Sequence, residues 1–148
     1  FDRTAFCVLP GIFLGRIANF INGELWGKET NLPIGFIFPA SGDFLLRHPS
    51  QIYEAVFEGL VPFIIMGCFL KFTNLFKKEG VFSSFFLIFY GISRFSIEAF
   101  FREGEGFINF GLFILSTGQA LSLLMIVLGM AIYFRSKLLL LPIVNWRV

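Results

Sequence analysis

An apolar stretch without a single charged residue runs from about residue 110 to about residue 134. A helix needs about 20 mostly apolar residues to cross the hydrocarbon core of a bilayer. The stretch is therefore predicted to be a transmembrane helix. Composition agrees, because 56% of the 148 residues are hydrophobic and only 15% are charged, whereas soluble domains have about 45–50% and about 25%.

Three further segments are long and apolar enough to span a membrane, although Pro10, Gly11 and Arg16 interrupt the first. The predicted spans cover about 4–22, 51–72, 80–101 and 110–134. Between the first two, residues of about 28–48 are rich in turn-forming Pro and Gly and are expected to form a small irregular arm. We predict an all-α polytopic transmembrane bundle, with residues 1–148 as a single membrane domain.

The charges are distributed unevenly between the predicted loops. Residues 71–79 carry three lysines against one glutamate, and the tail beyond residue 134 is also basic. Basic loops stay in the cytoplasm, so these regions are predicted to lie inside and the arm outside. The net charge of +2 lacks the clustered basic face that nucleic-acid binding requires.

The segment "GRIANFINGELWG", residues 15–27, places Arg16 and Asn19 within or beside the first span. A charged side chain at the bilayer centre costs about 2.5–3.5 kcal/mol on insertion scales, so it is usually functional. Gly23 and Gly27 permit turns or close backbone approach. The alternative is that the polar residues only hold helices together.

The segment "YGISRFSIEAFFR" repeats polar residues at every fourth position, which places them on one helix face. They are Tyr90, Arg94, Glu98 and Arg102. The alternative reading is an internal Arg94–Glu98 ion pair, with Arg102 extending to the membrane surface.

The segment "RHPSQIYEAVFEG" places Gln51, Glu54 and Glu58 on one face of the second span, at positions i, i+3 and i+7. The alternative is that this segment anchors the protein at the membrane interface around His48. His48 is the only histidine in the sequence, and a single histidine does not make a metal site. In the fourth span, Ser116, Gln119 and Ser122 are interpreted as helix-packing residues.

Arg16 and Arg94 are thus expected at the same depth, near several carboxylates. The planar guanidinium is well suited to bind phosphate, and a phosphate at this depth belongs to a phospholipid headgroup. We therefore expect an anionic lipid to bind from the outer leaflet. A transporter or channel remains an alternative, although transporters usually show related halves with broken helices, and the two halves of this sequence do not resemble each other.

These segments, together with "GQALSLLMIVLG", closely resemble the prolipoprotein diacylglyceryl transferase family of the bacterial inner membrane. The resemblance implies a multi-pass enzyme that moves the diacylglyceryl group of phosphatidylglycerol to the lipobox cysteine thiol in the signal peptide of a prolipoprotein. It implies no metal and no organic cofactor.

The resemblance also implies roles for particular residues. The expected catalytic residues are Arg16, Tyr90, Arg94 and Glu98. The expected substrate-binding residues are Arg16, Asn19, Glu24, Gly27, His48 and Glu54. Glu98 is expected to hold the Arg94 guanidinium, and Glu24 that of Arg16.

The resemblance covers essentially all 148 residues but only the C-terminal part of the family's length. Family members carry an upstream His-Gly-Gly motif whose histidine is the favoured base, and this motif is absent from the sequence. We therefore expect the sequence to be a fragment of an active enzyme that lacks its N-terminal spans. The alternative is a non-catalytic, lipid-binding remnant.

Overall fold

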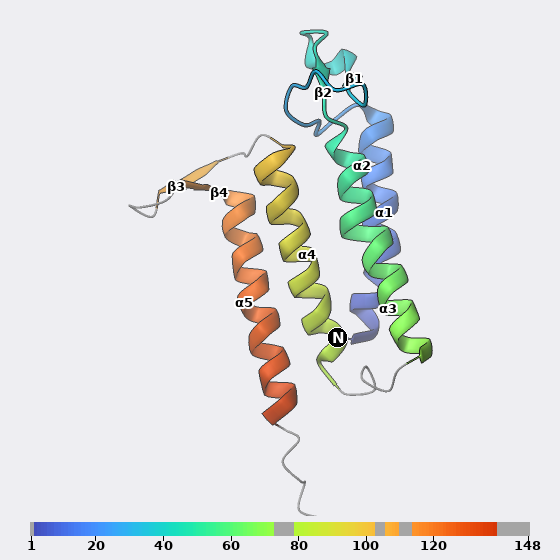
Figure 1. The fold of residues 1–148 in the computed structure, drawn as a ribbon, viewed down its shortest axis with the longest axis vertical. Coiled ribbons are helices and arrows are strands. Elements are labelled where there is room, and N and C mark those ends of the chain that lie inside the picture. The colour runs from blue at the N-terminus through green and yellow to red at the C-terminus, as the bar shows by residue number, and fades with distance from the viewer. Residues whose placement is uncertain (1, 73–78, 103–105, 110–113, 139–148) are drawn as a thin grey trace, which may run out of the picture.

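The computed structural model describes residues 2–72, 79–102, 106–109 and 114–138 (Figure 1). Its α-helices are α1 (Asp2–Asn22), α2 (Ser50–Glu54), α3 (Val61–Phe72), α4 (Val81–Phe100) and α5 (Thr117–Leu138). A π-helical turn, η2 (Ala55–Leu60), joins α2 to α3, and a 3-10 turn, η1 (Pro39–Ser41), lies in the arm. The antiparallel strand pairs are β1 (Phe36–Ile37) with β2 (Leu46–Arg47), and β3 (Phe107–Asn109) with β4 (Ile114–Ser116).

Four helical segments of the described chain are long and apolar enough to cross a membrane. They are α1, the continuous segment Ser50–Phe72, α4, and residues Thr117–Ser136 of α5. Large apolar side chains are exposed along these helices, such as Ile21, Ile64 and Val127, which is the surface that lipid tails solvate. The predicted all-α transmembrane bundle is confirmed, with two small strand pairs in addition, and the chain is a multi-pass membrane protein.

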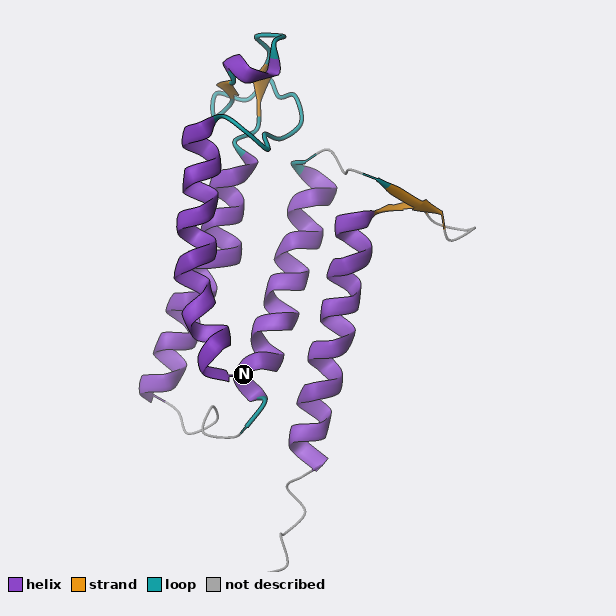
Figure 2. Cartoon of the chain, turned by 180° about the vertical axis from the view of Figure 1, so that it is seen from behind, coloured by secondary structure: helices purple, strands orange, loops and turns teal. Residues whose placement is uncertain are grey.

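The helices stand side by side in the order shown by Figures 1 and 2, with α1 beside α2 and α3, and α4 beside α5. The arm, residues 23–49, and the β3–β4 pair lie at the same end of the bundle (Figure 2). The N-terminus lies toward the other end, near the buried apolar cluster of Leu9, Met66 and Phe82.

Two glycines let α4 and α5 approach closely. A Cβ atom at Gly91 would lie 2.8 Å from the Ser122 carbonyl oxygen, and one at Gly129 would lie 2.9 Å from that of Ser84. Small residues at helix contacts are the usual means of packing in membranes, where the hydrophobic effect does not drive association. The backbones of α4 and α5 therefore pack directly against each other at these two glycines.

Asp2 fixes the start of α4 from a distant point in the sequence. Its carboxylate accepts hydrogen bonds from the backbone N–H of Gly80 at 2.8 Å and from that of Ser83, also at 2.8 Å. The Ser83 hydroxyl donates a third bond at 2.7 Å. A carboxylate at a helix N-terminus satisfies unpaired N–H groups and complements the helix dipole. Asp2 thereby ties α1 to α4.

The helix of the fourth span begins at Thr117, not near residue 110 as expected. Residues Ile114–Ser116 form β4 instead, and residues 110–113 lie outside the described part of the chain. Ser116 and Gln119 form a reciprocal capping box: the Gln119 N–H donates to Ser116 Oγ, and the Ser116 N–H donates to Gln119 Oε1. This pair stabilises a helix start at this point, and hydropathy alone overlooks it.

The first span is uninterrupted, because α1 continues through Pro10 from Asp2 to Asn22. Proline is tolerated in transmembrane helices when neighbouring groups satisfy the freed backbone carbonyl. The arm begins at residue 23, where Gly23 adopts a left-handed conformation with φ of 66°. It is slightly longer than the expected 28–48 and contains the β1–β2 pair.

Candidate active site

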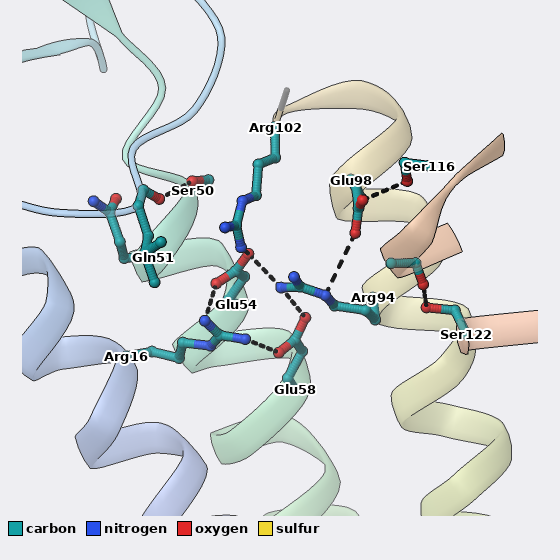
Figure 3. Close-up of polar contacts among 12 residues, drawn as sticks. Arg16, Ser50, Gln51, Glu54, Glu58, Arg94, Glu98, Arg102, Ser116 and Ser122 are labelled. Carbon is teal, nitrogen blue, oxygen red and sulfur yellow. Dashed lines mark hydrogen bonds and ion pairs between the residues drawn. The ribbon is translucent and has the colours of Figure 1, made fainter. Parts of the chain in front are cut away.

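Glu54 stands at the centre of a buried charge cluster (Figure 3). One carboxylate oxygen, Oε2, lies 2.9 Å from Arg16 Nη1, and the other, Oε1, lies 2.7 Å from Arg94 Nη1. Arg102 Nη1 lies 3.2 Å from Oε1 as well. Three arginines, two from separate spans and one just beyond the end of α4, therefore meet at one carboxylate.

Glu58 lies directly below Glu54 and shares two of the same partners. Arg16 Nη2 donates to Glu58 Oε2 at 3.3 Å, and Arg94 Nη1 lies 3.7 Å from Glu58 Oε1. Glu54 ends α2, and Glu58 lies within the π-helical turn η2. Such turns are frequent at functional sites because they redirect side chains within a helix. Here both carboxylates face the arginines of α1 and α4.

Glu98 is the third acid of the cluster. Its Oε2 lies 3.6 Å from Arg94 Nε, which matches the expected i, i+4 pair, and its Oε1 accepts a hydrogen bond from Ser116 Oγ. Arg94 is thus surrounded by Glu54, Glu58 and Glu98, each from a different direction (Figure 3). This arrangement fixes the guanidinium plane.

The carboxylates and arginines differ in their exposure. The side chains of Glu54 and Glu58 are 0% exposed, whereas those of Arg16 and Arg94 are 17% and 18% exposed. Burial of charges is costly unless they are paired, and here each buried acid is paired with arginine. The arginines supply the accessible part of the cluster, so an incoming anion meets positive charge first.

The cluster lies in the half of the bundle nearest the arm. Arg16 and Arg94 each precede the end of their helix by six residues, and Glu54 follows the start of α2 by four. At about 1.5 Å per residue, this places the cluster roughly 6–9 Å below the helix ends. The expected gathering of polar groups at one depth, on the arm side, is confirmed by these contacts.

The arm is tied to the cluster through the start of α2. Gln51 Nε2 donates to the Glu24 carbonyl at 2.6 Å, and Ser50 Oγ donates to the Leu25 carbonyl at 3.1 Å. Gly27 N–H donates to the His48 carbonyl at 2.9 Å. Any side chain at Gly27 would overlap the carbonyls of His48 and Phe101. Gly27 therefore acts by allowing close backbone approach.

Four expected binding residues lie outside the charge cluster: Asn19, Glu24, Gly27 and His48. Glu24 was expected to hold Arg16, and this is wrong: Glu24 is exposed and accepts a hydrogen bond from Asn22 Nδ2 at 3.3 Å. The reason is that Asn22 and Gly23 end α1 before Glu24 is reached. His48 lies against Tyr53 and Phe101, with Nδ1 at 3.2 Å from the Tyr53 hydroxyl.

Asn19 and Tyr90 lie on α1 and α4, the two helices that supply Arg16 and Arg94. The backbone carbonyl of Asn19 accepts the Glu24 N–H at 3.0 Å and so closes the end of α1. Tyr90 is half-buried, and the charges of Glu58 and Arg16 act on its hydroxyl. Tyr90 therefore borders the cluster one helical turn before Arg94, whereas Glu98 lies one turn after it.

Two members of the cluster were absent from the expected site residues. Glu58 is fully buried, and its position seven residues after Gln51 was the available signal. The alternative reading in which Arg102 extends to the membrane surface is wrong, because Arg102 is buried and paired with Glu54. The helix ends at Phe100, so Arg102 follows a turn that bends back toward α2.

A cavity of about 400 Å³ adjoins the cluster on the side of α5. Its lining includes Lys28, Glu98, Arg102, Phe107, Ser116 and Gln119. Lys28 Nζ donates to the Ala99 carbonyl at 2.8 Å, which ties the arm to the end of α4 beside this cavity. The cavity is bordered by basic, acidic and hydroxyl side chains.

The fold and the cluster define a polytopic membrane protein whose arginines and glutamates pair with one another in the half of the bundle nearest the arm. The sequence profile of the prolipoprotein diacylglyceryl transferase family matches residues 1–135. The chain belongs to this family.

Curated relatives support this assignment. Proteins named phosphatidylglycerol–prolipoprotein diacylglyceryl transferase from Ehrlichia ruminantium (strain Welgevonden) and Rickettsia bellii are 52% and 50% identical over 134 and 136 residues. A third, from Wolbachia pipientis wMel, is 48% identical over 128 residues. These alignments cover 86–92% of the chain and 48–51% of each relative. The chain thus spans about half the length of the curated relatives it matches.

Proposed function

We propose that this chain supplies the lipid-phosphate site of a phosphatidylglycerol–prolipoprotein diacylglyceryl transferase. The observation that carries the proposal is the convergence of Arg16 and Arg94, from two different spans, on the buried carboxylate of Glu54. The names of relatives with about 50% identity provide the reaction and the substrate, phosphatidylglycerol. The lipobox cysteine of the acceptor remains part of the proposal.

In the proposed reaction, the acceptor thiol attacks the glyceryl carbon that carries the phosphate ester. A C–S bond forms, the C–O bond breaks, and glycerol phosphate leaves. The thiol proton ends on the departing phosphate monoester, so atoms and charge balance. This is alkyl transfer, because the attacked atom is carbon and the P–O bonds stay intact.

Arginines suit this step because charge builds up on the leaving phosphate. The headgroup carries one negative charge as a diester and develops a second as the C–O bond breaks. Preorganised cations that bind the developing charge lower the barrier more than they stabilise the bound lipid. The same positive field favours the thiolate form of a cysteine, whose unperturbed pKa is about 8.5.

The acids of the cluster have a positioning role in this proposal. Glu54 and Glu58 hold the guanidinium groups of Arg16 and Arg94 in place before lipid arrives. The three glutamates balance the three arginines in formal charge, but Glu54 and Glu58 are fully buried, so the accessible side of the cluster is positive. The accessible part of each arginine then binds the phosphate without a large rearrangement.

We further propose that the protein lies in the bacterial inner membrane, with the arm in the periplasm and the C-terminus in the cytoplasm. The basic segment 71–79 and the basic tail support this orientation. The test is Ala40→Cys in the arm against Glu79→Cys at the other end, with Cys7 and Cys68 replaced by Ala. An impermeant maleimide should label only Ala40→Cys in intact cells, and the reverse pattern would refute the orientation.

The activity test places residues 1–135 in the matching segment of the Ehrlichia ruminantium relative. The chimera is assayed in phosphatidylglycerol liposomes for transfer to a lipobox peptide. We expect transfer that is lost in Arg16→Ala and in Arg94→Ala. A folded chimera that transfers no lipid, beside an active relative, would instead support the non-catalytic, lipid-binding alternative.

A further inference from the structure

We propose that Ser116, at the start of α5, is a positioning residue for the transfer reaction that holds the Glu98 carboxylate against Arg94. The inference rests on the proposed transferase function. It assigns a task to the α5 segment, whose polar residues the sequence had indicated only as packing contacts.

The hydrogen bonds around Ser116 give its hydroxyl a defined direction. Ser116 Oγ accepts the backbone N–H of Gln119 at 3.1 Å, and the Ser116 N–H donates to Gln119 Oε1 at 3.1 Å. One lone pair of the hydroxyl accepts in this capping box, and its O–H donates to Glu98 Oε1. Ser116 is 3% exposed and Glu98 is 6% exposed, so water does not compete freely for this bond.

Glu98 passes this constraint to Arg94. Its Oε1 is bound by Ser116, while its Oε2 lies 3.6 Å from Arg94 Nε (Figure 3). The Nη1 atom of Arg94 lies 2.7 Å from Glu54. The guanidinium is therefore fixed at two points, one on α2 and the other supported from α5 through Glu98. Two fixed points define its orientation better than one.

Gly118 completes the arrangement by leaving room for the acid. A Cβ atom built at Gly118 would overlap both oxygens of the Glu98 carboxylate. The carboxylate thus lies against the first turn of α5, whose partial positive charge favours an anion. Ser116, Gly118 and Gln119 together hold Glu98 in place.

Loss of the Ser116 hydroxyl should affect the transition state more than lipid binding. The freed Glu98 would rotate, and Arg94 would keep its charge and its contact with Glu54 but lose its fixed plane. Ground-state binding depends mainly on that charge, whereas the departing phosphate needs donors at defined positions. A fall in kcat with little change in KM is the expected signature.

The test uses the chimera described above with purified, detergent-stable variants. Ser116→Ala should lower kcat about tenfold to a hundredfold with KM for phosphatidylglycerol within about threefold, as expected for losing one hydrogen bond to a charged group. Ser116→Thr, which keeps the hydroxyl, should restore most of kcat. Ser122→Ala is the matched control, because Ser122 is also buried in α5 but donates to the Gly118 carbonyl at 2.7 Å.

A double-mutant cycle provides the second measurement. In a Glu98→Gln background, Ser116→Ala should have little further effect, because the group that it positions has already been changed. Additive losses would overturn the proposal, as would a Ser116→Ala enzyme with the kcat of Ser122→Ala, or no recovery in Ser116→Thr. Full activity in Arg16→Ala would overturn the proposed phosphate site instead, so the two failures are distinguishable.

Discussion

Arg16 and Arg94 bind opposite oxygens of one carboxylate, that of Glu54, at 2.9 Å and 2.7 Å. The two arginines come from α1 and α4, and Glu54 lies on the span between them. The acid therefore sets the separation of the two cations. In a phosphate site, that separation decides whether both arginines reach the same leaving group.

Removing the central charge should destabilise the protein strongly. Glu54→Gln keeps the side-chain shape but leaves Arg16, Arg94 and Arg102 with one buried partner fewer. Breaking a buried ion pair in this way costs about 3–5 kcal/mol. We expect a loss of this size in the free energy of unfolding, measured by denaturant titration in detergent.

The control for this variant is Glu29→Gln. Glu29 also pairs with an arginine, Arg47 at 3.6 Å, but its side chain is 61% exposed. Exposed pairs contribute about 0–1 kcal/mol, so Glu29→Gln should leave stability nearly unchanged. If both substitutions lowered the free energy of unfolding by the same amount, Glu54 would not be the charge that organises the cluster.

Replacing Arg16 by lysine should impair lipid transfer although the charge is kept. Arg16 uses Nη1 for Glu54 and Nη2 for Glu58, and a lysine ammonium does not reproduce this fork. We expect transfer to fall by about a hundredfold, the scale of losing one oriented donor to a developing anion. As a control, Arg47→Lys in the arm should keep the lipid-transfer rate within about twofold of the unsubstituted protein. If Arg16→Lys also stayed within that range, the forked contact of Arg16 would not matter for transfer.

The close packing of α4 on α5 should make Gly91 intolerant of a side chain. Gly91→Ala places a methyl group 2.8 Å from the Ser122 carbonyl, and the helices must separate. Overpacking of this kind costs about 1–3 kcal/mol. Thermal unfolding in detergent measures the loss.

Gly15→Ala is the matched control for Gly91→Ala. Gly15 is also a helix-interior glycine, but among the described residues no atom lies within 4 Å of a Cβ atom built there. Alanine is the better helix former by about 1 kcal/mol, so Gly15→Ala should be neutral or stabilising. Destabilisation of both variants to the same extent would mean that the α4–α5 contact is not responsible.

In the arm, Arg47 should keep Asp43 ionised in acid. The hydrogen bond from Arg47 lowers the pKa of the Asp43 carboxyl below its ordinary value of 3.8, and bonds from Ser41 and Leu45 add to the effect. Because the folded pKa is depressed, the contribution to arm stability is present above pH 4 and is lost only as the pH falls through the lower folded value. Carboxyl-carbon NMR titration should show this, and Arg47→Gln should move the Asp43 midpoint upward.

The sequence predicted the helical spans and the two arginine motifs because apolar length and intramembrane charge are local signals. Which of these residues pair with each other was harder to predict from the sequence than the spans and motifs themselves. Arg94–Glu98 follows from i, i+4 spacing, but the contact of Arg16 with Glu54 joins two spans whose relative rotation no local pattern defines. Glu24 was favoured for Arg16 by proximity in sequence, although the turn after α1 carries it outward.

The expectations for Arg102 and for the start of α5 were wrong for a related reason. Both depend on where a helix ends, and hydropathy averages over several residues. Arg102 bends back only because α4 stops at Phe100, and α5 begins only where Ser116 and Gln119 can cap each other. Capping signals locate such ends better than apolar length does.

The π-turn η2 holds one more residue per turn than an ideal α-helix would. A π-turn accommodates one extra residue within a helix, so deleting a single residue between Ala55 and Glu58 would restore regular winding and leave the residues beyond Leu60 close to their present orientation. Glu58 would then follow Glu54 by three positions instead of four, so its carboxylate would be aimed differently relative to its present partners, Arg16 and Arg94. Natural variants of this protein should therefore accept amino-acid replacements in this turn far more readily than a change in its length.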